Sequence, residues 1–113
     1  MIYLMTYSII YFNQEVQEEI LSLPTTLQAR YICLTERMIE YGPNLGLPHT
    51  AAFGSGLFEL RLKGIEGIAR VFFCTLVKQE IVMLHSFIKK TQKTPDKEMK
   101  IARQRMKELN NAS

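Results

Sequence analysis

The sequence predicts an α+β domain: an N-terminal strand and an αα-hairpin packed on a small, curved, largely antiparallel sheet of about four strands, with a helix at the C-terminus. Two observations favour this fold class. The segment GLFELRLKG (56–64) alternates apolar and charged residues with a period of two, and two further β-rich segments follow it. Apolar residues recur every three or four positions from Leu27 to Tyr41, as in a helix packed by one side. The length of 113 residues favours one domain, residues 1–113.

The N-terminal half is expected to supply one strand and two helices. Residues 2–11 are rich in Ile, Tyr and Leu and indicate a strand. Asn13 can cap a helix that runs to about Leu21, and Pro24 separates it from a second helix that ends at Tyr41-Gly42-Pro43. The buried stripes of the two helices are expected at Val16, Ile20 and Leu23, and at Leu27, Tyr31, Leu34, Met38 and Tyr41.

The rest of the chain is expected to form a loop, three strands and a last helix. Residues 43–56 are rich in glycine and proline and predict a loop, in which His49 should simply be exposed. Strands are predicted over residues 58–63, 68–75 and 80–87, with turns at Gly64–Gly67 and Lys78-Gln79. Thr94 caps and Pro95 opens the final helix. Its buried stripe is expected at Met99, Ala102, Met106 and Leu109.

Strand parity predicts which side chains share a face of the sheet. If the strands pair without a register slip, one set lies on the face away from the helices: Glu59, Arg61, Lys63, Arg70, His85 and Phe87. The apolar set should then face the helices: Phe58, Leu60, Leu62, Val71, Phe73, Val82 and Leu84. A single β-bulge would break this assignment, because one extra residue reverses the parity of every later residue in the strand.

Charge is distributed unevenly along the chain. Residues 1–60 contain two basic and six acidic residues, a net charge of −4, whereas residues 61–113 contain twelve and five, a net charge of +7. Such a split indicates a face that attracts a polyanion, and solvated lysines on a surface helix are the alternative. Cys33 and Cys74 lie in apolar patterns, and no export signal or bilayer-spanning segment is visible. Both are expected to be free core residues in a reducing cytoplasm, with no metal or other cofactor bound.

The charged face suits RNA. Arginine offers a planar fork to a phosphate, lysine offers a mobile charge, and an aromatic ring such as Phe87 can stack on an unpaired base. The predicted RNA-binding residues are Lys63, Phe87, Lys89 and Lys93. His85 and Glu59 make catalysis possible, because cleavage by the 2′-OH needs a base and an acid. Each has a plain structural alternative: a strand histidine bonded to a neighbour, and a carboxylate paired with an arginine of the adjacent strand.

Four segments carry a resemblance to a known family. They are GLFELR (56–61), GIARVFF (67–73), IVMLHSFIKKTQKTP (81–95) and the pattern E-x-x-x-A-x-x-R (98–105). Together they resemble the phage-related HigB toxins of the RelE/ParE toxin–antitoxin superfamily. The resemblance implies a metal-independent mRNA endonuclease that acts on translated mRNA in the ribosomal A site. It also implies a HigA-like helix-turn-helix antitoxin as partner, with DNA contacted only through the antitoxin complex.

The resemblance also implies roles for single residues. Arg70 matches the family position G-x-x-R-x-x-F/Y and is expected to contact the scissile phosphate. Arg61 ends the ELR motif and is expected to be a second phosphate contact or a charge stabiliser, and Lys90 falls where related toxins place a basic residue. No tyrosine follows Tyr41, so proton transfer would fall to His85, to Glu59, or to lysine and arginine alone.

The sequence is also compatible with two other functions. One is a non-enzymatic inhibitor of DNA gyrase, like the ParE side of the superfamily. The other is a degenerate phage remnant that folds and binds its partner but no longer kills. The complete set of charged-face residues favours an active protein.

Overall fold

The computed structural model describes residues 6–76 and 79–112, which form three helices and a five-stranded sheet. In chain order the elements are β1 (Ser8–Tyr11), α1 (Gln14–Leu21), α2 (Thr25–Tyr41), β2 (Thr50–Ala52), β3 (Phe58–Gly64), β4 (Gly67–Leu76), β5 (Glu80–Lys89) and α3 (Asp96–Ala112). The strand order is β1-β5-β4-β3-β2, in which β1 runs parallel to β5 and the other neighbours are antiparallel. The predicted α+β fold is confirmed.

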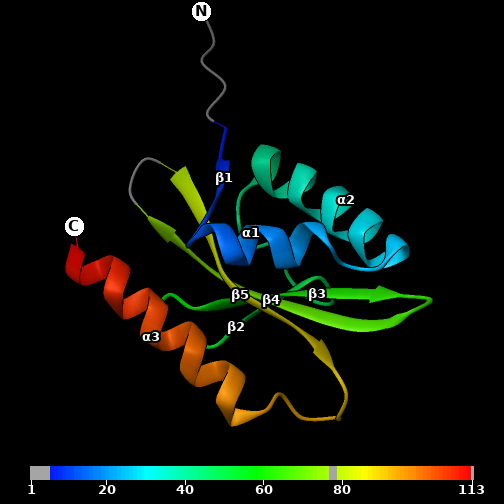
Figure 1. The fold of residues 1–113 in the computed structure, drawn as a ribbon. Coiled ribbons are helices and arrows are strands. Elements are labelled where there is room, and N and C mark those ends of the chain that lie inside the picture. Colours follow the sequence, from blue (N-terminus) through cyan, green and yellow to red (C-terminus); the bar gives the residue numbers. More distant parts are fainter. Residues whose placement is uncertain (1–5, 77–78, 113) are drawn as a thin grey trace, which may run out of the picture.

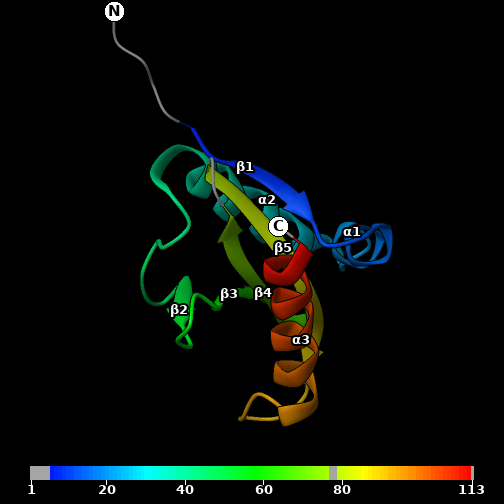
Figure 2. The ribbon, with the colours of Figure 1, turned by 90° about the vertical axis from the view of Figure 1, so that its left-hand side faces the viewer.

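Helices cover the two faces of the sheet unequally. Helices α1 and α2 lie on one face, and α3 lies on the other, near one end (Figures 1 and 2). The larger core joins α1 and α2 to β3, β4 and β5, with side chains such as Leu34, Leu60 and Val71 fully buried. A second core packs Ala102 and Met106 of α3 against Phe72 and neighbouring side chains of β4 and β5. Part of this second face is therefore left open beyond α3.

The tip of the β3–β4 hairpin holds the start of α2. Pro24 precedes α2 and makes no side-chain cap, so the first amides of the helix need another acceptor. The Glu66 carboxylate supplies it by accepting from the Thr26 amide, with Oε2 3.0 Å from the nitrogen, and from the Thr26 hydroxyl. Gly64 lets the hairpin approach this closely, because a Cβ there would collide with Thr26 Oγ1. The predicted turn at Gly64–Gly67 is confirmed and also joins two distant parts of the chain.

A β-bulge in β5 corrects the parity assignment. Phe72 pairs with His85 but Phe73 pairs with Met83, so Leu84 is the extra residue. His85 and Phe87 therefore lie on the same face as Arg70, as predicted. Val82 and Leu84, predicted to face α1 and α2, are instead buried beneath α3. Arg105 of α3 satisfies the backbone at the bulge, where Nη1 donates to the Leu84 carbonyl at 2.8 Å.

Three smaller expectations also changed. The predicted loop 43–56 contains β2, which pairs with β3. Tyr41, at the end of the α2 stripe, is exposed, and so is Cys33, whereas Cys74 is buried and both thiols are free. The first residues of the predicted strand 2–11, and Lys78 of the predicted turn, fall outside the described residues.

Candidate functional site

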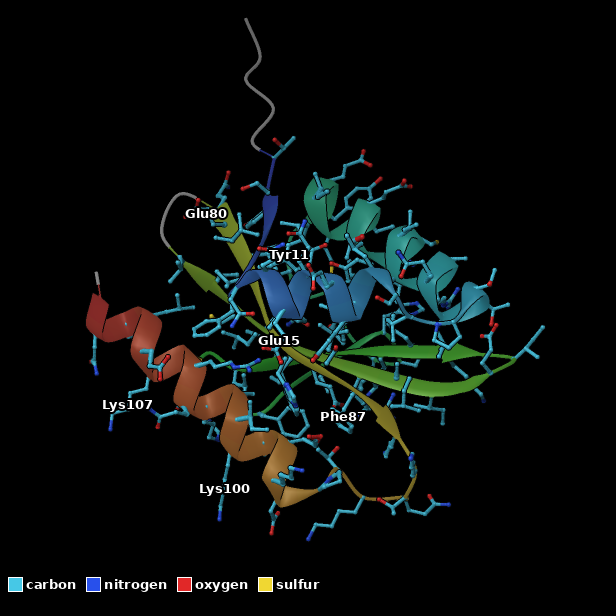
Figure 3. The ribbon with its side chains drawn as sticks, in the orientation of Figure 1. Tyr11, Glu15, Glu80, Phe87, Lys100 and Lys107 are labelled. Atoms are coloured by element: carbon cyan, nitrogen blue, oxygen red, sulfur yellow. The ribbon has the colours of Figure 1, made fainter. Side chains whose placement is uncertain are left out.

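The open half of the sheet carries a row of side chains that crosses three strands. Arg61 of β3 lies directly opposite Arg70 of β4, and Arg70 lies opposite Phe87 of β5. Side chains opposite each other on one face have Cβ atoms about 4.5–5.5 Å apart. Figure 3 shows Phe87 on the side of the sheet that faces away from α1 and α2. The predicted charged face therefore exists, and its centre is this arginine pair.

Glu59 lies beneath the arginine pair and binds both members. Its Oε1 is 3.2 Å from Arg61 Nε and 3.6 Å from Arg70 Nε, and its Oε2 accepts from the Thr94 hydroxyl at 3.4 Å. The Glu59 side chain is 1% exposed, so the carboxylate is buried rather than open to solvent. The structural alternative foreseen for Glu59, a pair with an arginine of the adjacent strand, is present.

The two arginines differ in their access to solvent. The side chain of Arg61 is 36% exposed, whereas that of Arg70 is only 12% exposed. Burial lowers the pKa of the Arg70 guanidinium, the nearby Glu59 carboxylate raises it, and Arg61 lowers it further. An arginine nonetheless keeps its proton at all ordinary pH values. The site thus holds two permanent positive charges side by side, one largely buried and one more open to solvent.

His85 lies on the same face but at the edge of α3. Its Nε2 is 3.1 Å from Oε1 of Glu98, and 11% of its side chain is exposed. The imidazole also stacks on Phe87, with centroids 6.2 Å apart, and Phe87 stacks in turn on Phe72. The foreseen alternative for His85, a bond to a neighbour, is therefore also present, and this bond joins β5 to α3.

The lysines surround the arginine pair at the surface. A cleft of about 340 Å³ lies between β3, the segment after β5 and α3, and its lining includes Glu59, Arg61, Lys89 and Lys93. Lys90 is exposed and lines a separate cleft of about 380 Å³ with Lys89. The structure thus joins Glu59, Arg61 and Arg70 by contact, and places Lys90 at the margin.

The basic residues of α3 fall into two groups. Arg103 and Arg105 donate to backbone carbonyls of Phe53 and Leu84, at 2.9 Å and 2.8 Å, and so fix α3 to the sheet. Lys100 and Lys107 are exposed, and Figure 3 shows both side chains pointing away from the sheet. The lysines of α3 therefore fit the simpler alternative of solvated charges on a surface helix.

A second cleft contains residues that sequence reasoning did not connect. It has a volume of about 320 Å³ and is lined by Arg30, Pro48, His49, Arg61, Lys63, Ile68 and Arg70. His49 is half-buried here rather than simply exposed. No local pattern indicates this position, because it depends on the pairing of β2 with β3, which only the folded chain shows.

Within residues 6–76 and 79–112, no group of three or more His, Cys, Asp or Glu side chains could hold a metal ion. In that same part of the chain, no helix is long and apolar enough to cross a bilayer.

The fold and site define a small α+β protein with a basic, partly open sheet face, and comparisons add its family. The chain belongs to the phage-derived Gp49-like family: the family described as "Phage derived protein Gp49-like (DUF891)" matches residues 18–107. A chain of the archaeal RelE–RelB complex from Pyrococcus horikoshii OT3 is similar, with 22% sequence identity and a TM-score of 0.49. That match covers 74% of this chain and 96% of the other. No curated protein matches the chain.

Proposed function

We propose that the chain is the toxin of a type II toxin–antitoxin system, a metal-independent endoribonuclease that cuts translated mRNA in the ribosomal A site and so inhibits translation. The HigB-like segments between residues 56 and 105 support this proposal. The observation that carries it is the arginine pair, because Arg61 and Arg70 lie directly opposite each other on an open sheet face. Two adjacent guanidinium groups match the oxygens of a phosphodiester.

The arginine pair provides the electrostatic part of the reaction. When the 2′-oxygen attacks phosphorus, negative charge grows on the phosphate oxygens. Fixed positive groups stabilise that charge most when they need not reorganise during the reaction. Glu59 holds Arg70 in place, since the carboxylate is buried and lies 3.6 Å from its Nε. In this proposal Glu59 positions the arginines, and Arg61 and Arg70 contact the scissile phosphate.

The surrounding residues would bind the rest of the RNA. Lys63, Lys89 and Lys93 flank the pair and can contact neighbouring phosphates, while the edge of the Phe87–Phe72 stack offers a surface for a base. Lys90 would act from the margin of the site. His85 can transfer a proton to RNA only if its surroundings open, because Nε2 is bonded to the Glu98 carboxylate and Nδ1 is buried.

The proposal includes partners and a compartment. The toxin would meet mRNA on the cytoplasmic ribosome. A HigA-like helix-turn-helix antitoxin would neutralise it, and DNA would be contacted only through the antitoxin complex. The net charge of +7 in residues 61–113 favours both an RNA target and an acidic surface on the antitoxin.

Mapping of mRNA 5′ ends tests the proposal. Wild type, Arg61→Gln and Lys107→Gln would each be induced, with primer extension within minutes. Both variants remove one positive charge, but Lys107 points away from the sheet (Figure 3). We expect cuts inside translated frames with wild type and Lys107→Gln, and none with Arg61→Gln. Growth arrest by wild type without any cuts would refute the RNase, and nucleoid collapse with an SOS response would then indicate gyrase inhibition.

A further inference from the structure

The row of side chains on the open face continues to the residue just before a fourth strand, β2, which begins at Thr50. Thr50 of β2 pairs with Leu60, so the preceding residue, His49, lies opposite Arg61. A backbone hydrogen bond confirms this register: the Arg61 amide donates to the His49 carbonyl at 2.8 Å. Thr50 and Leu60 are buried, whereas His49, in the turn that leads into β2, lines a cleft together with Arg61 and Arg70. The row is therefore His49, Arg61, Arg70 and Phe87.

The row places an imidazole beside the proposed phosphate site. His49 lines the same cleft of about 320 Å³ as Arg61 and Arg70. Adjacent strands are about 4.8 Å apart, so His49 lies about one strand spacing from Arg61 and two from Arg70. A phosphate held between the arginines would thus have the imidazole on one side and Phe87 on the other.

We propose that His49 is the general base of RNA cleavage, an inference that rests on the proposed function. The imidazole takes the proton of the 2′-OH, and the 2′-oxygen forms a bond to phosphorus. The bond from phosphorus to the 5′-oxygen then breaks, and this oxygen takes a proton from solvent water. The products are a 2′,3′-cyclic phosphate and a 5′-OH end, and the proton on His49 returns to solvent.

The charges around His49 favour the neutral form that a base requires. Among the residues that the structure describes, the charged side chains that line its cleft are all basic: Arg30 of α2, Arg61 and Lys63 of β3, and Arg70 of β4. Arg37 of α2 adds a further positive charge that repels the protonated imidazole. Partial burial lowers the pKa of His49 below its ordinary value, and repulsion by Arg37 and Arg30 lowers it further. At neutral pH the imidazole is therefore mostly unprotonated, ready to accept a proton.

The two histidines of the chain differ in whether their imidazole is free to accept a proton from RNA. His85 is bonded to Glu98 and 11% exposed. His49 lines an open cleft, and no carboxylate lines that cleft with it. Because the sequence contains two histidines, a pair of variants can assign any titration near neutral pH.

The experiment compares wild type, His49→Gln and His85→Gln as purified full-length chains acting on ribosome–mRNA complexes. The rate of cleavage is measured with toxin in excess from about pH 5 to pH 9. The wild-type rate should rise with pH and level off, with a midpoint below about 6.5. His49→Gln should lose about 10²–10⁴-fold in rate and also lose this pH dependence, since a base contributes on that scale. His85→Gln should keep the pH dependence.

Binding and folding measurements separate the possible outcomes. His49→Gln should bind mRNA carrying a 2′-deoxy nucleotide at the cleavage site as tightly as wild type, and should melt at the same temperature. An equal loss of binding and rate would make His49 a binding residue and overturn the assignment. Loss of the pH dependence in His85→Gln alone would assign the base to His85. If wild type cuts nothing at any pH, the proposed function fails; if wild type cuts and His49→Gln matches it, only this inference fails.

Discussion

Replacement of Arg70 by alanine should affect both folding and activity. Arg70 is one of two cations that neutralise Glu59, whose side chain is 1% exposed. Removing one partner from a buried ion pair generally costs about 3–5 kcal/mol, because it leaves a charge without compensation. Here Arg61 remains 3.2 Å from the same oxygen, and Arg70 keeps some solvent contact. We therefore expect Arg70→Ala to lower the free energy of unfolding by about 1–3 kcal/mol, and to abolish toxicity.

A double-mutant cycle with Glu59→Gln isolates this interaction. The glutamine is nearly the same size and carries no charge, so Arg70→Ala should cost much less in that background. The free energy of unfolding would be measured by urea denaturation of four proteins: wild type, the two single variants and the double variant. A cost of Arg70→Ala that is the same in both backgrounds would refute the reasoning, and so would an Arg70→Ala variant as stable as wild type.

Three further predictions concern folding and reactivity. Leu60→Ala should lower the free energy of unfolding by about 2–5 kcal/mol in urea, because Leu60 is fully buried and leaves a cavity. Hydrogen bonds from Thr26 lower the pKa of Glu66, so this contact stabilises the fold at neutral pH and is lost only as the pH falls through that lowered pKa. Glu66→Gln should therefore melt earlier than wild type at pH 7, and the difference should shrink and vanish as the pH falls below the ordinary range of a glutamate. Burial raises the pKa of Cys74 to about 11, so iodoacetamide should label only the exposed Cys33 until the chain unfolds.

Local sequence patterns predicted the helices and most of the sheet correctly. The stripe from Leu27 to Met38 is buried, and the alternation around Leu60 sets the two faces of β3. These predictions succeed because helix and strand periods directly determine which side chains point the same way. The assignment failed at Leu84, where a bulge adds a residue. A bulge depends on partners across the sheet, here including the Arg105 side chain that binds its carbonyl.

The site was harder to predict than the fold because the solvent exposure of its side chains depends on which distant segments pack over them. Period two correctly placed Glu59 and His85 on the charged face, but said nothing about exposure. The segment before α3 and α3 itself contribute Thr94 and Glu98, and these contacts bury both groups. His49 illustrates a different gap: it does lie in a loop, but the pairing of β2 with β3, which begins at the next residue, places it opposite Arg61 and partly buries it.

A buried carboxylate beside the proposed phosphate site has a physical explanation. Arg61 and Arg70 are direct cross-strand partners, and like charges in that arrangement repel and destabilise a sheet. Glu59 offsets the repulsion, since its Oε1 lies within 4 Å of a guanidinium nitrogen of each arginine. The contact also leaves the net charge of the three groups at +1. In the proposed function, a phosphodiester that approaches the open side would meet two guanidinium groups that Glu59 already holds next to each other. The protein would thus align the arginines before the substrate binds, and the buried Glu59 carboxylate is what this alignment requires.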